Sequence, residues 1–233
     1  MRALIAALLL LPAAAGAADD LKLEATSARY SVAWSGTGLG EATITLTPLE
    51  HNCYRYVQQT DPVWLVRVLY GSPRETSLFC IEENGAIRVS HFEYRNDKRD
   101  KDSFTVDFDW AQKRVTGIKR GVVTVHELPE GTYDRFALQQ VVRLWAKAHA
   151  DDKDPPTVEY NMADDDRVTA YKFAIIGREK VETPAGTFDT LRVDRVDNPS
   201  RELRSWLAPS RDYAPVKIEN VEKGEVKLRM LLK

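Results

Sequence analysis

The chain has 233 residues, and its 33 Lys and Arg residues nearly balance its 35 Asp and Glu residues. Nucleic-acid-binding proteins usually carry a basic excess, so this composition argues against nucleic acid as a partner. The length suits one domain, or two small ones, with a substantial core.

The first segment of the chain has the three parts of a cleavable secretory signal peptide. Arg2 supplies a positive start, residues 3–11 form an uncharged apolar run, and Pro12 precedes a run of small residues. We therefore predict a signal peptide over residues 1–18.

The small residues at the end of this segment place the cleavage before Ala18 or Asp19. A transmembrane anchor needs about 20 apolar residues, and the apolar run is shorter than that. We predict a periplasmic protein without a transmembrane anchor, consisting of a single β-rich domain over residues 19–233.

From Tyr30 onward, apolar and polar residues alternate in a series of short segments. Alternation with a period of two is typical of half-buried antiparallel strands, and glycine-rich turns separate several of the segments. The predicted strands cover residues 30–34, 42–46, 53–58, 77–81, 86–94, 103–110, 114–119, 122–127, 157–162, 167–176, 179–183, 186–196, 202–207, 215–221 and 225–232.

Two segments have helical spacing instead. Residues 134–148 place Leu138 and Trp145 on a helical repeat behind Asp134, a residue type that caps helix N-termini. A shorter candidate helix covers residues 62–69. Many strands with one substantial helix predict an all-β dominated fold, with an antiparallel sheet curled into a barrel, half-barrel or sandwich. The helix would plug an open end or cover a face.

Five segments occur in the same order as similar segments of one exported bacterial family. They are residues 30–42, 108–110, 128–134, 177–188 and 206–218. Together they make the chain resemble the family known as domain of unknown function 3108. The resemblance implies export and a β-rich fold, and it carries over no catalytic residue or ligand.

The two cysteines, Cys53 and Cys80, both belong to the predicted mature chain. In an oxidising compartment such a pair is a disulfide candidate. Closing a loop of about 27 residues would stabilise the fold by roughly 3 kcal/mol in the chain-entropy model. Two free buried thiols are the alternative, and no Cys-x-x-Cys pair supports a reactive cysteine.

Sequence motifs for catalysis or metal binding are missing. The four histidines show neither His-x-His nor His-Glu-x-x-His spacing. The acidic run 164–166 lies where a loop is expected, which favours a solvated surface over a cation site. We therefore predict no catalytic residue, no metal site and no cofactor. A hydrolase with paired carboxylates stays open, because such a pair is defined by its separation in space.

The aromatic residues give the main functional hint. Most are expected in the core, but some can line a cavity inside a curled sheet, where an apolar ligand usually binds. We therefore expect a non-enzymatic binding protein for an apolar or lipid-like small molecule, or for an envelope protein as partner. The alternatives are a hydrolase acting on an envelope polymer and a structural or assembly factor without a ligand. The candidate cavity or patch residues are Trp34, Trp64, Leu65, Trp110, Trp145 and Trp206.

Overall fold

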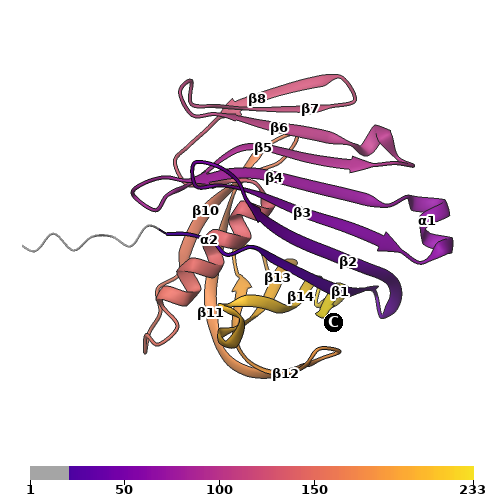
Figure 1. Cartoon of the computed structure of the whole chain (residues 1–233), viewed down its shortest axis with the longest axis vertical. Coiled ribbons are helices and arrows are strands. Elements are labelled where there is room, and N and C mark those ends of the chain that lie inside the picture. Colours follow the sequence, from indigo (N-terminus) through magenta and orange to yellow (C-terminus); the bar gives the residue numbers. More distant parts are fainter. Residues whose placement is uncertain (1–20) are drawn as a thin grey trace, which may run out of the picture.

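The computed structural model describes residues 21–233, which form one sheet of 15 strands with two α-helices (Figure 1). The helices are α1 (Trp64–Tyr70) and α2 (Arg135–Ala148), and two short 3₁₀ helices cover Asp100–Asp102 and Pro209–Arg211. The strands are β1 (Thr26–Trp34), β2 (Thr37–Pro48), β3 (Cys53–Pro62), β4 (Pro73–Ile81), β5 (Ile87–Asn96), β6 (Phe104–Asp109), β7 (Arg114–Lys119), β8 (Val122–Glu127), β9 (Thr132–Tyr133), β10 (Val158–Ala163), β11 (Val168–Thr183), β12 (Gly186–Arg195), β13 (Arg201–Ala208), β14 (Ala214–Glu222) and β15 (Glu225–Leu232).

The first and last strands meet in the middle of the sheet. Its order is β8-β7-β6-β5-β4-β3-β2-β1-β15-β14-β13-β12-β11-β10-β9, so each half follows the chain as a meander. The halves join where β1 pairs antiparallel with β15, with Tyr30 opposite Leu232. All pairs are antiparallel except the short parallel pair of β9 and β10. Both halves therefore depend on a contact between residues about 200 positions apart in the chain.

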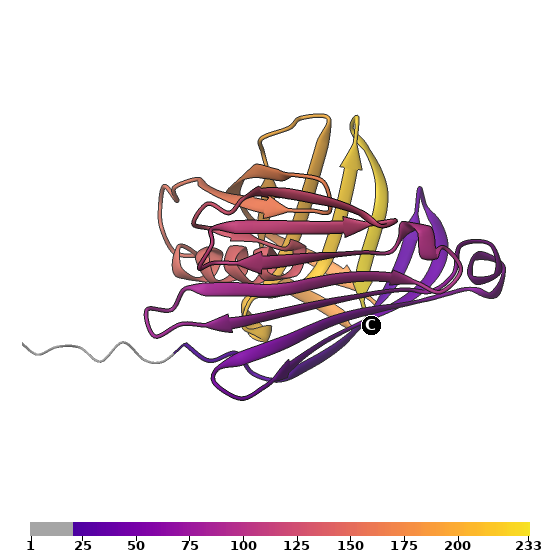
Figure 2. The same ribbon diagram turned by 90° about the horizontal axis from the view of Figure 1, so that it is seen from above.

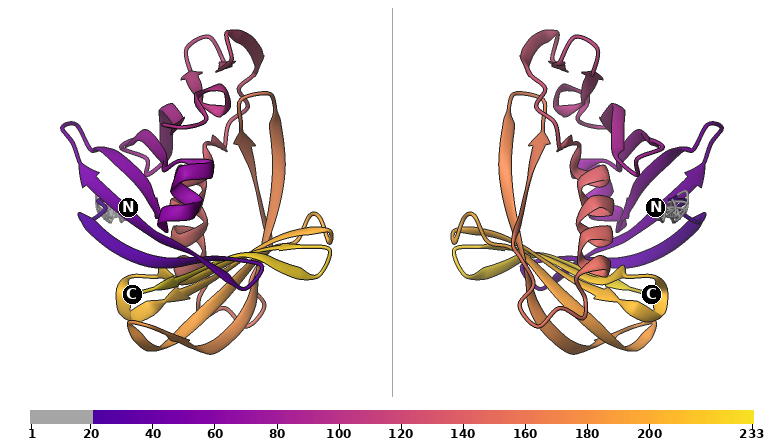
Figure 3. Two further views of the ribbon diagram at one scale, coloured as in Figure 1. Left: turned by 90° about the vertical axis from the view of Figure 1, so that its right-hand side faces the viewer. Right: turned by 90° about the vertical axis from the view of Figure 1, so that its left-hand side faces the viewer.

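The sheet curls so that its two halves face each other, with α2 between them (Figure 3). In Figures 1 and 2, α1 lies at the opposite end of the strands from α2. The predicted antiparallel curled sheet is confirmed, and it takes the open form, because within residues 21–233 the outer strands β8 and β9 do not pair with each other.

The two ends of the open sheet are joined by a loop contact instead of a strand ladder. The turn between β10 and β11 lies against the β7–β8 hairpin, where a Cβ atom added at Gly117 would overlap the carbonyl oxygen of Asp165. In the same place, Lys119 Nζ lies 2.8 Å from Asp165 Oδ2. The absence of a side chain at Gly117 thus allows the close approach of the two backbones.

The start of α2 is fixed by Asp134, as its position before the helical repeat predicts. One carboxylate oxygen of Asp134 accepts hydrogen bonds from the main-chain nitrogens of Phe136 (2.7 Å) and Ala137 (3.0 Å). The other oxygen accepts a hydrogen bond from Ser77 Oγ on β4 (2.5 Å). Asp134 therefore caps the helix and also ties it to the sheet.

Aromatic rings pack α2 against one half of the sheet. The Phe136 ring on α2 lies 4.7 Å from the Tyr56 ring of β3 and 6.0 Å from the Phe92 ring of β5, between ring centroids. These rings are buried and belong to a core that continues along the inner face of the other half, through residues such as Val193 and Ile218. The core thus lies between the halves, around α2.

Some sequence predictions differ from the structure. The strands predicted at residues 167–176 and 179–183 form the single strand β11, in which a bulge between Ile175 and Gly177 shifts the register. The helix predicted at residues 62–69 is α1. The predicted signal peptide, residues 1–18, lies outside the described residues. Among the residues described, no helix is both long enough and apolar enough to span a membrane.

Candidate functional site

A cavity of about 400 Å³ lies between α2 and the inner face of the curled sheet. Its volume is within the range of small-molecule sites, which are mostly apolar with a few polar groups. Both halves of the sheet contribute to its wall, because alternate residues of each strand point inward. The apolar lining residues are Tyr94, Phe136, Leu138, Val142, Met162, Tyr171, Phe173, Val193, Leu203, Leu207, Ile218, Leu228 and Met230, with Pro73 and Pro215.

Arg135 and Glu75 line the cavity at the start of α2 and form an ion pair, and Asp164 outside the lining completes the cluster. Arg135 Nη1 donates to Glu75 Oε1 at 2.8 Å, and Arg135 Nη2 donates to Asp164 Oδ1 at 3.2 Å. The Arg135 guanidinium also lies over the Phe92 ring, 5.2 Å from its centroid. Burial raises the pKa of Glu75, although Arg135 opposes the shift. In this cluster two carboxylates share one guanidinium, so its positive charge is fully compensated.

A second polar group lies further along α2 and is incompletely paired. Arg143 and Gln140 line the cavity and are 8% and 6% exposed. Among residues 21–233, Arg143 Nε and Gln140 Oε1 are buried without a hydrogen-bond partner. The carboxylate nearest to Arg143 is Asp212, with Oδ2 3.7 Å from Nη2, and Asp212 Oδ1 already accepts a hydrogen bond from Lys147 at 2.5 Å. Burial lowers the pKa of Arg143, as expected for a guanidinium that lacks a close counter-ion.

The cavity adjoins a second, more open hollow of about 680 Å³ on the side of α1. Thr60, Pro73 and Tyr94 line both, so the two spaces adjoin, and we refer to the more open hollow as the entrance. Val66 and Tyr70 of α1 also line it. The outer surface of α1 is apolar and exposed, which puts a patch of large apolar side chains beside the entrance.

Three of the predicted site residues lie at this entrance or beside it. Trp34, at the end of β1, lines the hollow and is 49% exposed. Trp64 and Leu65 lie on α1 and are 75% and 58% exposed. The structure therefore places these three outside the cavity itself, near its opening.

The other three predicted residues lie away from the cavity lining. Trp110 donates from Nε1 to the carbonyl oxygen of Val89 (2.7 Å). Trp145 is half-buried on α2, with its ring against that of His149. Trp206 is buried on the opposite face of β13 from the cavity, because its neighbours Ser205 and Leu207 are the residues that line it.

Trp206 is held on this face by polar neighbours. Its Nε1 donates a hydrogen bond to Glu179 Oε2 at 2.9 Å, and this bond is the main reason why the pKa of Glu179 is lowered. Lys217 Nζ lies 3.9 Å from the Trp206 ring centroid. Trp206 thus packs under a layer of charged side chains on the outside of the sheet.

Gln140 and Arg143 were not predicted from the sequence as site residues, although their spacing from Phe136 indicates a position inside the fold. Both residues follow Phe136 at positions i+4 and i+7, which lie on the same face of a helix. Two polar residues on a face that also carries a buried Phe indicate a polar feature inside the fold. The sequence prediction considered only the apolar residues of this helix, and it therefore missed the two polar residues on the buried face.

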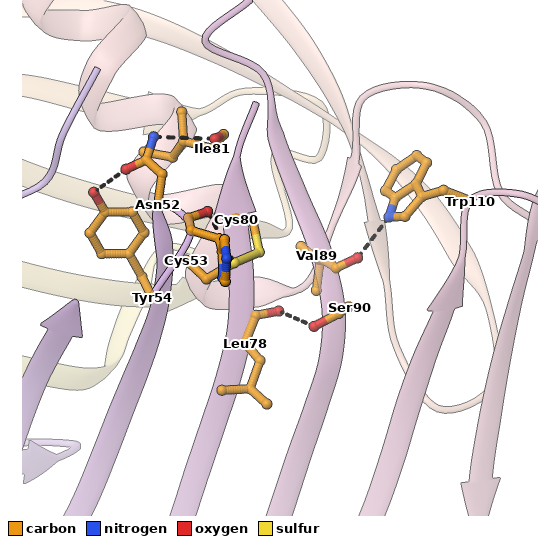
Figure 4. The surroundings of a disulfide bond; sticks show 10 residues. Asn52, Cys53, Tyr54, Leu78, Cys80, Ile81, Val89, Ser90 and Trp110 are labelled. Atoms are coloured by element: carbon orange, nitrogen blue, oxygen red, sulfur yellow. Dashed lines mark hydrogen bonds between the residues drawn. A yellow bond between two sulfur atoms is a disulfide. The ribbon is translucent and has the colours of Figure 1, made fainter. Parts of the chain in front are cut away.

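The two cysteines lie opposite each other on β3 and β4, away from the cavity (Figure 4). The sulfur atoms of Cys53 and Cys80 are at disulfide-bonding distance, 1.98 Å, which supports the predicted pairing. Beside them, Asn52 donates to the carbonyl oxygen of Ile81 (3.2 Å) and accepts from the Tyr54 hydroxyl (2.7 Å). The pair therefore joins β3 and β4 at one end of the two strands, next to the turn that precedes β3.

The acidic run 164–166 is used in ion pairs. Asp164 contacts Arg135, and Asp165 contacts Lys119. Within residues 21–233, no group of three His, Cys, Asp or Glu side chains is placed to hold a metal ion. Of the residues described, Glu75 is the one acidic residue that lines the cavity.

Comparison with known proteins supports the fold and names a family. The family model described as "Protein of unknown function (DUF3108)" matches residues 29–231. Among solved structures, the chain is similar to a beta-barrel-like protein of the domain of unknown function DUF1849 from Brucella abortus. The TM-score is 0.54 and the identity 15%, covering 91% of this chain and 97% of that chain. At this identity the likeness shows the fold alone. No curated protein is significantly similar in sequence.

Proposed function

The chain belongs to the family of proteins of unknown function DUF3108, as the sequence resemblance predicts, and we propose that it binds a small apolar or amphipathic molecule. The cavity between α2 and the curled sheet is the observation that carries this proposal. It has a predominantly apolar wall, a volume of about 400 Å³ and an entrance beside α1. These are the properties of a small-molecule binding site.

The cavity favours binding over glycoside hydrolysis. A hydrolase with paired carboxylates needs two carboxyl groups on either side of one bond. Within the described chain, Glu75 lines the cavity without a second acidic residue, and its carboxylate is engaged by Arg135 at 2.8 Å. We therefore prefer the binding function to that of a hydrolase acting on an envelope polymer.

We also propose that the protein works in the periplasm after export. The sequence pattern of residues 1–18 and the proximity of Cys53 and Cys80 support this location, because disulfides persist in oxidising compartments. N-terminal sequencing of the protein from a periplasmic fraction should give a start at Ala18 or Asp19. An intact Met1 on protein retained in the cytoplasm would contradict export.

The binding function is tested by native mass spectrometry of the protein purified from its own cells. We expect a co-purifying small molecule, and we expect the delipidated protein to bind the uncharged fluorescent probe 1-N-phenylnaphthylamine. Ser205→Phe places a ring in the cavity and should abolish probe binding. Thr187→Phe adds the same ring at an exposed position of β12 and should leave binding unchanged.

The controls make the outcome decisive. Both variants should keep the wild-type circular dichroism spectrum, so that a loss of binding reports on the cavity. If the native protein carries no ligand and the delipidated protein does not bind the probe, the proposed binding function is wrong. If Ser205→Phe and Thr187→Phe bind the probe equally well, the binding site lies elsewhere.

A further inference from the structure

We propose that the ligand carries an acidic group, a carboxylate or a phosphate, which binds to Arg143 inside the cavity. This inference rests on the proposed binding function and names the chemical class of its ligand. An apolar chain attached to the acidic group would lie against the apolar wall. The ligand class is therefore an acidic amphiphile, such as a fatty acid.

Within residues 21–233, the charge of Arg143 has no close partner. Its side chain is buried and lines the cavity, and its Nε atom has no hydrogen-bond partner among residues 21–233. Its nearest carboxylate, that of Asp212, is 3.7 Å away and is bonded more closely to Lys147. Two positive groups thus share one negative group at this point, and a buried charge is stable only when it is paired.

Arg135, the other arginine that lines the cavity, differs from Arg143 in its partners. Arg135 is paired with both Glu75 and Asp164, so it needs no ligand. The two arginines are eight residues apart on α2, or about 12 Å along the helix axis. The cavity therefore has a compensated end at Arg135 and an uncompensated positive end at Arg143.

Polar and apolar groups are arranged around Arg143 as an acidic amphiphile requires. Gln140 precedes Arg143 by three residues and presents its amide on the same face of α2, where its Oε1 atom also has no partner among the described residues. Leu138 and Val142 of α2, with Leu207 opposite, supply apolar wall next to this polar pair. A guanidinium suits a carboxylate or phosphate because it donates two parallel hydrogen bonds.

The test compares an acidic amphiphile with its uncharged counterpart. Palmitate and 1-hexadecanol are titrated against the delipidated protein by displacement of 1-N-phenylnaphthylamine. Acetate and inorganic phosphate are titrated alone, to separate an amphiphile site from a site for a small free anion. We expect palmitate to bind about tenfold or more tightly than hexadecanol, as a charged hydrogen bond allows, and the small anions to displace no probe.

Variants of the polar pair make the test specific. Arg143→Gln should weaken palmitate binding by about tenfold or more and leave hexadecanol binding unchanged, while Arg143→Lys should keep part of the preference. Asp212→Asn removes the competing carboxylate at a residue with φ of 51°, a conformation that Asn tolerates. Asp212→Asn should therefore strengthen palmitate binding and not hexadecanol binding.

The outcomes separate this inference from the proposed function. If palmitate and hexadecanol bind equally well to the wild type, the cavity binds ligands but the acidic-group inference is wrong. If acetate or phosphate alone competes as well as palmitate, the site is one for a free anion, and the amphiphile is ruled out. If neither chain displaces the bound probe, the acidic-group inference is wrong and the proposed function stands. The proposed function fails as well only if the probe does not bind and the native protein carries no ligand. If Arg143→Gln does not fold, Asp212→Asn still tests the inference. An unchanged palmitate affinity of Asp212→Asn would overturn the proposed role of Arg143.

Discussion

Thr124 Oγ1 on β8 donates a hydrogen bond to the main-chain carbonyl oxygen of Asp165, at 2.5 Å. The bond joins the hairpin at one end of the sheet to the turn between β10 and β11 near the other end. The two ends of the open sheet are therefore joined by a loop that packs on a hairpin. This contact depends on Gly117, which lies under the same carbonyl group.

We predict that Gly117→Ala destabilises the fold by about 1–3 kcal/mol, because its Cβ atom would overlap the Asp165 carbonyl oxygen. Gly38→Ala is the matched control, since a Cβ atom there meets no atom within 4 Å. The measurement is urea unfolding of the wild type and both variants. Equal stability of the two variants would show that the contact between the hairpin and the turn contributes little.

The local elements of this fold were predictable from the sequence, but the contact that joins the two ends of the sheet was not. Asp134 and the helical repeat behind it predict α2 because capping and periodicity are local properties. The loop contact at Gly117 joins segments about 48 residues apart, and nothing in the neighbouring sequence indicates it. In β11, the bulge at Gly177 interrupts the alternation, which is why one strand was predicted as two.

The candidate site was predictable only in part, for a similar reason. The sequence predicts an apolar cavity inside a curled sheet, but the residues predicted to line it are mostly tryptophans, which the structure places elsewhere. Trp206 lies on the outer face, because the inward positions of β13 are Leu203, Ser205 and Leu207. Which face of a strand points inward is decided by pairing and curvature, which a single strand's sequence does not contain.

We predict that Trp206→Ala costs about 3–5 kcal/mol, because a large buried side chain is removed. Trp64→Ala should change stability by less than about 0.5 kcal/mol, since Trp64 is 75% exposed on α1. Trp206→Phe keeps most of the packing and loses the hydrogen bond to Glu179, so its cost should be about 1 kcal/mol. Thermal and urea unfolding measure all three, and a Trp206→Ala variant as stable as Trp64→Ala would contradict the burial of Trp206.

We predict that reduction of the Cys53–Cys80 pair destabilises the protein by about 3–4 kcal/mol, the chain-entropy value for a separation of 27 residues. The measurement is urea unfolding with and without a reducing agent. In the double variant Cys53→Ser with Cys80→Ser, the reducing agent should have no effect on stability. A wild type that is equally insensitive would mean that the two thiols are not bonded in the protein.

We predict that Glu75 makes the stability of the fold depend on pH. Burial raises the pKa of Glu75 above its ordinary value of 4.5, so the folded protein binds this proton more readily than the unfolded chain. The contribution of Glu75 to the free energy of unfolding is therefore constant below the ordinary value and decreases as the pH rises through the raised pKa. Glu75→Gln removes this titration, so wild-type stability should fall relative to this variant as the pH increases.

Glu225 gives the matched control with the opposite sign. The hydrogen bond from Lys227 lowers the pKa of Glu225, so its contribution is present above the ordinary value and is lost as the pH falls through the lowered pKa. Urea unfolding between about pH 3 and pH 8 of the wild type, Glu75→Gln and Glu225→Gln measures both differences. A wild-type advantage over Glu75→Gln that grows with pH would show that Arg135 outweighs burial. The buried pair would then stabilise the charged carboxylate, because the Coulombic attraction at 2.8 Å would exceed the desolvation cost.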